Sequence, residues 1–347
     1  MLKTKLSTAI ALAAVLSLLL TPAAYAAGAG STSGSFGALG QAPTVTLIQI
    51  YSNSGCTIVA DSMDPYITEY WCKVSVDSAN KLKHLNQVKA TLFYNNTGDN
   101  TTAAPGISNT QTCAILTCTI AGPPGYIQTF SILPFGGTTW QLGTCTPPAD
   151  LNANTGDWIF AFWPGKVATE ATGLESPPCF WDAQGLATNR SSQTGELYLR
   201  GKYMNCYSEI TVTGSVNWGD VPLGLTFENV ANPQPASDNI TITYIANGDY
   251  KSDIKSTNWE SGGDNVTLST GNPPGGSGEF ALKAYSSDNL TAAVVVTTGY
   301  TPMDETGTIT LDAGTPVSAN RLWLALSTLG ILPGTYTGTI WYQIECR

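Results

Sequence analysis

The stretch Ile240–Tyr285 reads ITITYIANGDYKSDIKSTNWESGGDNVTLSTGNPPGGSGEFALKAY. Short runs of β-branched, aromatic and apolar residues alternate in it with clusters of Gly, Pro, Asn and Asp. The runs predict strands, because their side chains suit a pleated, half-buried surface, and the clusters predict tight turns. Strands at this spacing, with no helices between them, indicate an antiparallel sandwich rather than a parallel sheet with crossover helices.

The same pattern extends along the chain in both directions. Only Ser78–Gln87 suggests a helix, of one or two turns. We predict an all-β chain of two antiparallel sandwich domains, 43–206 and 207–347, closely abutted because no long linker separates them. The other strands expected in the second domain are Ile210–Val216, Ala292–Thr298, Gly307–Leu311, Leu322–Leu326 and Tyr336–Ile344. Those expected in the first include Val45–Tyr51, Tyr70–Val76, Val88–Tyr94 and Trp158–Trp163.

The N-terminal residues 1–26 have the pattern of a secretory signal peptide. Lys3 and Lys5 precede the apolar run Ala9–Leu20, and Ala24-Tyr25-Ala26 supplies the small residues of a cleavage site. The run is too short for a permanent transmembrane helix, and we expect no other membrane span. Residues 27–42 are rich in Gly, Ala and Ser, which predicts a flexible tail. We therefore expect a secreted protein.

The net charge of the chain limits the classes of partner that it can bind. The chain has 15 basic and 25 acidic side chains, a net charge of −10. Removal of residues 1–26 takes two lysines away and makes the net charge −12. A surface of this sign repels phosphate, so we expect neither a nucleic acid nor an anionic lipid as partner.

Eight cysteines stand in the mature part, and an even number in an exported chain predicts disulfides rather than a metal site. The number of cysteines leaves the connectivity open. Short loops favour Cys56–Cys72 and Cys113–Cys118, which leaves Cys145–Cys179 and Cys206–Cys346.

Six Asn-x-Ser/Thr sequons are candidates for N-glycosylation, which would place them on loops or outward strand faces. They begin at Asn95, Asn100, Asn189, Asn239, Asn265 and Asn289.

The segment DLNANTGD places oxygen-bearing side chains at Asp150, Asn152, Asn154 and Asp157. Such side chains suit a hard cation such as calcium. The glycine comes one place later than in an EF-hand loop, and Ala161 stands where that loop needs glutamate. We interpret the segment as an Asx-rich turn and predict neither a metal nor another cofactor, with a calcium loop as the alternative.

We predict no catalytic residues. The chain contains none of the motifs Gly-x-Ser-x-Gly, His-Glu-x-x-His or the Walker loop, and its single histidine, His84, stands between polar residues. A secreted glycoside hydrolase is the enzymatic alternative, since that reaction needs only two carboxylates. Its candidates are Glu170, Glu175 and Asp182, which carry no distinguishing signature.

Aromatic residues suggest a second alternative, a carbohydrate-binding module. Aromatic faces stack on sugar rings, but sandwich cores also use tryptophan, so both interpretations stay open. The tryptophans concerned are Trp71, Trp140, Trp158, Trp163 and Trp181.

The stretch Val216–Asn247 resembles the opening of immunoglobulin-like sandwich modules of prokaryotic secreted and cell-surface proteins. The matching residues are Trp218-Gly219, Pro222-Leu223-Gly224 and Ile240–Gly248. Leu332–Ile344 (LPGTYTGTIWYQI) is similar to the closing hairpin of such modules.

The first domain is similar to PKD-like sandwiches, where Val74–Asp77 leads through a short connection to Val88–Tyr94. Both resemblances imply structural, adhesive or spacer modules whose partners are other surface proteins, copies of the same chain, or glycans. The tail 27–42 suggests assembly by addition of a strand to a neighbouring copy.

Overall fold

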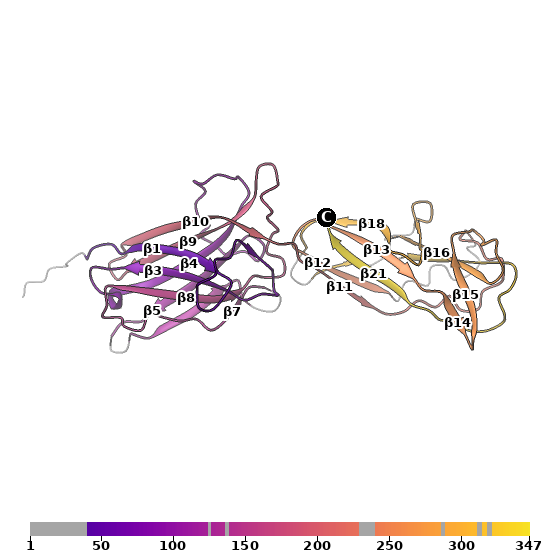
Figure 1. Cartoon of the computed structure of the whole chain (residues 1–347), viewed down its shortest axis with the longest axis horizontal. Coiled ribbons are helices and arrows are strands. Elements are labelled where there is room, and N and C mark those ends of the chain that lie inside the picture. Colours follow the sequence, from indigo (N-terminus) through magenta and orange to yellow (C-terminus); the bar gives the residue numbers. More distant parts are fainter. Residues whose placement is uncertain are drawn as a thin grey trace, which may run out of the picture. The chain divides into compact units, whose positions relative to one another are not determined.

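The computed structural model describes residues 40–123, 126–135, 139–228, 240–285, 289–310, 314–317 and 321–347. Over these ranges the chain is all-β, as predicted (Figure 1). Most strand pairs are antiparallel, as expected, but two pairings are parallel, so the sheets are antiparallel and mixed. The predicted signal peptide at 1–26, residues 27–39 of the tail and the sequon at Asn239 lie outside the described residues. No helix in the described ranges is long and apolar enough to cross a bilayer.

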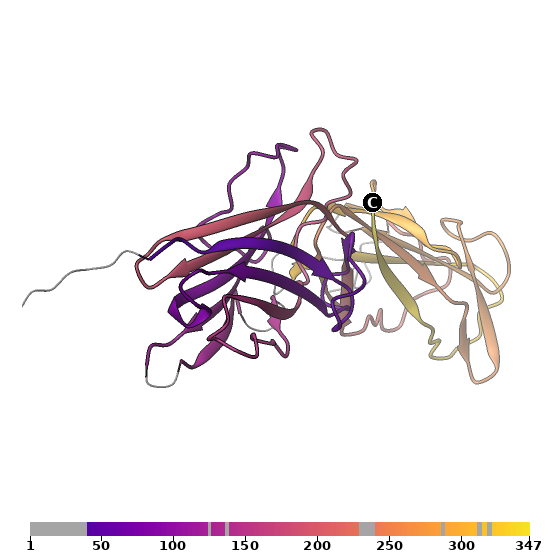
Figure 2. The same cartoon turned by 60° about the vertical axis from the view of Figure 1, so that its left-hand side comes forward.

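Two sheets form the first half of the described chain. Apart from a parallel pairing of β2 with β10, their strands pair antiparallel. The four-stranded sheet has the order β1 (Thr44–Tyr51), β3 (Tyr70–Asp77), β8 (Thr155–Trp163) and β7 (Gln141–Leu142). The six-stranded sheet has the order β2 (Ser62–Met63), β10 (Thr194–Met204), β9 (Phe180–Asn189), β4 (Leu85–Asn95), β5 (Cys113–Ile120) and β6 (Gln128–Leu133). Figure 2 shows the indigo strands β1 and β3 side by side, as their pairing requires.

Alternating side chains of these strands build one hydrophobic core. Val74 of β3 and Phe160 of β8 are fully buried in it, together with Leu92 of β4. On the opposite face of the four-stranded sheet, Lys73 and Asp157 form an ion pair of 2.6 Å between Nζ and Oδ2. Apolar residues therefore recur with the period of two that a strand imposes.

The short helix expected at Ser78–Gln87 is wrong in extent. One 3-10 turn, η1 (Leu82–His84), is followed at once by β4, which begins at Leu85. Leu82 and Leu85 are both fully buried. This segment is therefore a connection that delivers the chain into a strand.

The second half forms three hydrogen-bonded sheets of shorter strands. The first has the order β11 (Ser208–Thr213), β12 (Thr241–Ala246) and β19 (Thr315–Val317), and the second β18 (Thr301–Gly307), β13 (Tyr250–Ser256) and β21 (Ile340–Cys346). The third has the order β14 (Trp259–Ser261), β15 (Asp264–Ser269), β16 (Glu279–Tyr285) and β17 (Val294–Val295), with β20 (Arg321–Leu326) also paired to β16.

The second half has its own core, and its turns follow the predicted chemistry. Tyr244 and Phe280 are buried in a cluster separate from that of the first half. Gly262 and Gly263 connect β14 to β15 with positive φ values of 59° and 102°. A two-residue hairpin of this kind favours glycine, because other residues are strained at positive φ.

Candidate functional site

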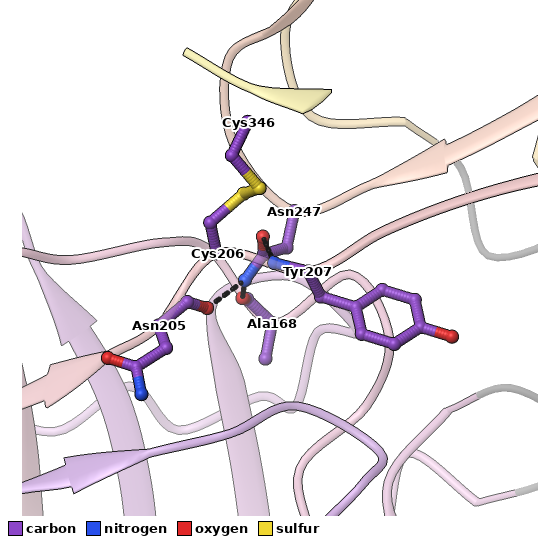
Figure 3. The surroundings of a disulfide bond; sticks show 6 residues. All are labelled: Ala168, Asn205, Cys206, Tyr207, Asn247 and Cys346. Carbon is purple, nitrogen blue, oxygen red and sulfur yellow. Dashed lines mark hydrogen bonds between the residues drawn. A yellow bond between two sulfur atoms is a disulfide. The ribbon is translucent and has the colours of Figure 1, made fainter. Parts of the chain in front are cut away.

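A disulfide joins the connection between β10 and β11 to the end of β21. Cys206 and Cys346 are bonded with their Cα atoms 6.2 Å apart, across a sequence separation of 140 residues (Figure 3). The predicted pair Cys206–Cys346 is thereby confirmed. The bond closes the second half into a covalent ring at the point where it meets the first half.

The side chain of Asn247 lies beside this disulfide and is fully buried. Its Nδ2 donates to the carbonyl oxygens of Ala168 at 2.7 Å and Asn205 at 2.9 Å. Its Oδ1 accepts from the backbone N–H of Tyr207 at 2.6 Å. Figure 3 shows the amide between these groups. One side chain from the β12–β13 turn thus ties together two other segments of the backbone.

A partly buried ion pair stands on the same connection. Lys166, which is 8% exposed, pairs with Glu209 of β11. The hydroxyl of Tyr207 also donates to Glu209, at 2.6 Å. These hydrogen bonds, from Lys166 first and Tyr207 second, hold the pKa of Glu209 below its usual value. The ammonium of Lys166 also lies 4.6 Å from the ring centre of Tyr66. The buried ammonium of Lys166 therefore has the carboxylate of Glu209 on one side and the ring of Tyr66 on the other.

Further contacts bind residues of the two halves. Gln111 Nε2 donates to the carbonyl of Thr310 at 3.0 Å, and Glu170 N donates to the carbonyl of Asn247 at 2.9 Å. A Cβ placed on Gly248 would meet the carboxylate of Glu170, which would have to move, and would lie 3.0 Å from the Cβ of Glu170, so glycine suits this close approach. We call the disulfide, Asn247, the Lys166–Glu209 pair and these contacts the junction. The residues of the junction hold segments of the two halves together.

Two of these side chains were missed by sequence reasoning. Asn247 was recognised only as part of an Asn-Gly-Asp turn, and Lys166 carried no motif at all. The turn signal placed Asn247 at the end of a strand correctly, since β12 ends at Ala246. The approach of the 166–170 segment, which buries both side chains, depends on the tertiary fold.

The other predicted cysteine pairs are not bonded. Cys113 and Cys118 both belong to β5, so their Cα atoms lie about 16 Å apart at the rise of a strand. A disulfide spans at most about 7 Å between Cα atoms, and the pair Cys113–Cys118 is therefore wrong. The bonds Cys56–Cys72 and Cys145–Cys179 are also absent from the structure. The thiols are Cys56, Cys72, Cys113, Cys118, Cys145 and Cys179.

The oxygens of the candidate calcium loop are used by lysines and by the backbone. Lys73 pairs with Asp157, and Lys83 Nζ donates to Asn152 Oδ1 at 3.0 Å. Asp150 accepts from the backbone N–H of Asn152 at 2.7 Å, as in an Asx turn. Among the described residues no group of three or more His, Cys, Asp or Glu side chains is arranged to hold a metal ion. At Asn154, the backbone carbonyl accepts a hydrogen bond from the backbone N–H of Ser78.

We expect millimolar calcium to leave the thermal unfolding midpoint of the purified chain unchanged. Ammonium groups occupy the oxygens that a cation would need at Asn152 and Asp157, and a ligand stabilises only the state that binds it. The check is a thermal melt in calcium against the same melt in a chelator. A midpoint that rises with calcium concentration would contradict the assignment of this loop as a turn.

The candidate sequons divide into buried and exposed sites. Asn95 and Asn189 are 2% and 5% exposed, and the Nδ2 of each is used inside the fold. That of Asn95 donates to Asp182 at 2.8 Å, and that of Asn189 donates to the carbonyl of Gln41 at 3.1 Å. By contrast, the remaining described sequons are exposed at Asn100, Asn265 and Asn289.

In a host that adds N-linked glycans, we expect the folded chain to carry them only at the exposed Asn100, Asn265 and Asn289, among the described sequons. A glycan on Asn95 or Asn189 would break buried hydrogen bonds, and a chain carrying one would not reach the native state. Glycopeptide mass spectrometry of the folded fraction measures the occupancy. A glycan found on either buried site in that fraction would overturn the assignment.

Most candidate tryptophans belong to the core. Trp140, Trp158 and Trp181 are buried, and their indole N–H groups donate inside the fold at 3.1, 3.0 and 2.7 Å. Trp71 and Trp163 are half-buried. A groove of about 540 Å³ beside the 146–157 loop contains no aromatic residue in its lining. The three buried indoles are therefore closed to a sugar, whereas Trp71 and Trp163 lie on the outer face of the four-stranded sheet.

The candidate catalytic groups are engaged in structural contacts. Asp182 is buried and accepts from Arg200 at 2.8 Å and from Gly201 N at 2.9 Å. Glu175 accepts from the backbone of its own loop; burial raises its pKa, but these hydrogen bonds lower it below its usual value. The pKa of Glu170 is raised by burial and then by nearby negative charge. His84 is exposed at the end of η1.

No protein-family model matches the chain, and no curated protein matches it. Among solved structures, dimeric latent PorU from Porphyromonas gingivalis is similar at 8% identity with a TM-score of 0.12. The match covers 87% of this chain and 33% of that one, so this chain spans about a third of that structure's length. This likeness is too low to indicate a shared fold, and the functional conclusion rests on the junction.

Proposed function

We propose that this chain is a secreted structural or adhesive protein of the cell surface that works without catalysis. The observation that carries the proposal is the covalent closure of the second half by Cys206–Cys346. Tension applied through these two residues is borne by the disulfide and does not draw out the strands between them. Disulfides of this kind persist in oxidising compartments, in agreement with the signal peptide expected at 1–26.

We also infer that the two halves are two immunoglobulin-like domains, 43–206 and 207–347. The hydrophobic cluster of the first half shares no residue with the two clusters of the second half, which supports this division because a domain has its own core. The junction then acts as a fastening between domains, where buried hydrogen bonds add to the covalent bond. The disulfide beside the junction and the hydrogen bonds of Asn247, Gln111 and Glu170 restrain the two domains, which suits a surface protein that presents its domains outward.

The test is the location and redox state of the protein in its host. Protease added to intact cells is expected to remove it, and the Cys206–Cys346 peptide is expected to be oxidised in that fraction. A cytoplasmic protein with both thiols reduced would overturn the proposal. A panel of glycosidase and esterase substrates serves as the second measurement. Turnover of any of them by the purified chain would show that the protein is an enzyme and would contradict the proposal.

Assembly through the tail is part of this proposal, with a second copy of the chain as partner. β6 is one of the two outer strands of the six-stranded sheet in the described ranges, and an outer strand offers free backbone groups to an added strand. Size-exclusion chromatography and electron microscopy of chains with and without residues 27–42 test it. We expect multimers only when the tail is present. If the chain is a monomer both with and without the tail, assembly through the tail is wrong.

Carbohydrate binding is the second candidate, and a row of exposed side chains favours it. Lys255 of β13 pairs across the sheet with Trp341 of β21, and Ile254 pairs with Thr301, which places Tyr300 beside the same row. Tyr300 is 43% exposed and Trp341 is 48% exposed. The ammonium of Lys255 lies 4.2 Å from the ring centre of Tyr300. Two exposed rings beside a hydrogen-bond donor suit a sugar ring.

A glycan array of the purified chain tests this second candidate. Trp341→Ala is expected to abolish any signal, while Tyr203→Ala, which removes a 38% exposed ring of the first half, is the matched control. Binding that survives Trp341→Ala, or no binding to any glycan, would exclude this row as a sugar site.

A further inference from the structure

Cys118 faces the interior between the two sheets of the first half. It is fully buried and pairs with Val88 on β4 and Phe130 on β6. Leu116 and Ile120, two residues to either side, belong to the same core cluster. Since side chains alternate along a strand, Cys118 points from the six-stranded sheet toward the four-stranded sheet.

Cys145 lies on the segment between β7 and β8 and faces the same interior. Backbone hydrogen bonds from Gly143 and Thr146 to β8, at 2.7 and 2.8 Å, hold this segment alongside that strand. Two residues, Thr144 and Cys145, stand between Gly143 and Thr146 and face the single residue Phe160, as in a β-bulge. The side chain of Cys145 packs against the core of the first half, in which Phe160 is fully buried.

Side chains next to the two cysteines meet across the interior. The rings of Phe130 and Phe160 lie 5.5 Å apart, edge to face. Gln128 Oε1 on β6 accepts from the indole N–H of Trp158 at 3.0 Å, and the sulfur of Cys118 lies 3.9 Å from the same oxygen. The part of β8 that Cys145 flanks therefore reaches the side chains that surround Cys118.

Electrostatics agree with this proximity. The pKa of the Cys118 thiol is raised to about 12, chiefly by burial; a hydrogen bond from Trp158 lowers it, and charge at Cys145 contributes to the rise. In the same way, charge at Cys56 raises the pKa of the Cys72 thiol, so Cys56 is the cysteine that lies near Cys72. Cys72 pairs with Phe160 from the other side of β8, about 10 Å from Cys145 across two strand spacings, which is too far for a disulfide.

The remaining cysteines are unsuitable partners for Cys118. Cys113 lies on the opposite face of β5, five residues away. Cys179 precedes β9 at the end of the sheet where β4 reaches Asn95, whereas Cys118 pairs with Val88. These two positions on β4 are about 23 Å apart at the rise of a strand. Cys145 is therefore the cysteine that the fold brings toward Cys118.

We propose that Cys118 and Cys145 form a second disulfide, which joins the six-stranded sheet to the four-stranded sheet. The oxidant is a small disulfide such as oxidised glutathione. One cysteine thiolate attacks it and releases one glutathione thiolate, and the other cysteine displaces the second. The two cysteines lose two electrons and two protons, and the oxidant becomes two thiols. Because Cys118 is fully buried, the exchange takes place while the chain folds.

The test uses the chain refolded from its reduced state in a glutathione redox buffer. Thiols are blocked with N-ethylmaleimide in denaturant, and the chain is then digested with trypsin. No Lys or Arg stands between Lys89 and Lys166, so one peptide holds Cys113, Cys118 and Cys145. In the Cys113→Ser variant this peptide contains only the proposed pair. It is expected to take up no maleimide before reduction and two after it.

Two results would overturn the proposal. One is full alkylation of Cys118 and Cys145 before reduction, and the other is a cross-link from either residue to a different cysteine. The wild-type chain, digested with chymotrypsin to cleave after Leu116, supplies the same measurement without a substitution. The test does not depend on the proposed function, because it measures the chemistry of the purified chain in any redox buffer.

Discussion

Replacing both Cys206 and Cys346 by serine is expected to lower the free energy of unfolding by about 5 kcal/mol. The reason is the loop that the bond closes: a separation of 140 residues removes a large share of the unfolded chain's entropy in the chain-entropy treatment. A loss of this size is a large fraction of the stability of a typical domain. Urea unfolding of the second half within the full chain, followed by tryptophan fluorescence, measures this loss of unfolding free energy.

The double substitution avoids an unpaired thiol, and Cys56→Ser is the control because Cys56 is a half-buried thiol outside the junction. The control is expected to stay within about 1 kcal/mol of the wild type, the usual range for a mild substitution. If the double variant unfolded at the same urea concentration as the control, the hydrogen bonds of the junction, and not the disulfide, would hold the second half closed.

Local strand patterns could be predicted from the sequence where burial alternates cleanly. The expected strands Tyr70–Val76 and Trp158–Trp163 correspond to β3 and β8, because one face of each is buried and the other carries polar side chains. The strand expected at Gly307–Leu311 is wrong over residues 308–310, and Leu311 lies outside the described residues. Thr301–Gly307 forms β18 instead, although TPMDETG contains little β-branched or aromatic sequence. The edge of β13 imposes that pairing, and such tertiary context overrides local propensity.

The candidate site could also be predicted only in part, because its contacts depend on tertiary context that local sequence patterns do not contain. The pair Cys206–Cys346 followed from elimination, yet Cys113–Cys118 failed because a continuous strand cannot bend back on itself over five residues. Short sequence separation favours a disulfide only where the intervening chain is a turn. The burial of Asn247 depends on segments about 40 and 80 residues away, which no local pattern contains.

Asn247→Asp is expected to destabilise the chain by about 3–5 kcal/mol at neutral pH. The substitution keeps the shape of the side chain but replaces two donors with a carboxylate oxygen. The carbonyl groups of Ala168 and Asn205 then lose their hydrogen bonds, and a negative charge is buried beside them. The matched control is Asn217→Asp, because Asn217 is exposed and uses only its acceptor oxygen, toward Gly219 N at 2.9 Å.

The variant should also acquire a dependence on pH with a defined sign. Burial and the two carbonyl oxygens raise the pKa of the introduced carboxyl in the folded state above its unfolded value of about 4. The folded chain then binds the proton more tightly than the unfolded chain. Stability relative to the wild type is therefore highest below pH of about 4 and falls as the pH rises through the folded pKa.

Urea unfolding at several pH values, with Asn247→Asp compared with Asn217→Asp, measures both effects. Protonation restores one donor and leaves the other missing, so recovery at low pH is expected to be incomplete. An Asn247→Asp variant as stable as the control at neutral pH would mean that the amide of Asn247 is not what holds the 168 and 205 segments together. In that case the disulfide and the Lys166–Glu209 pair would carry the junction without it.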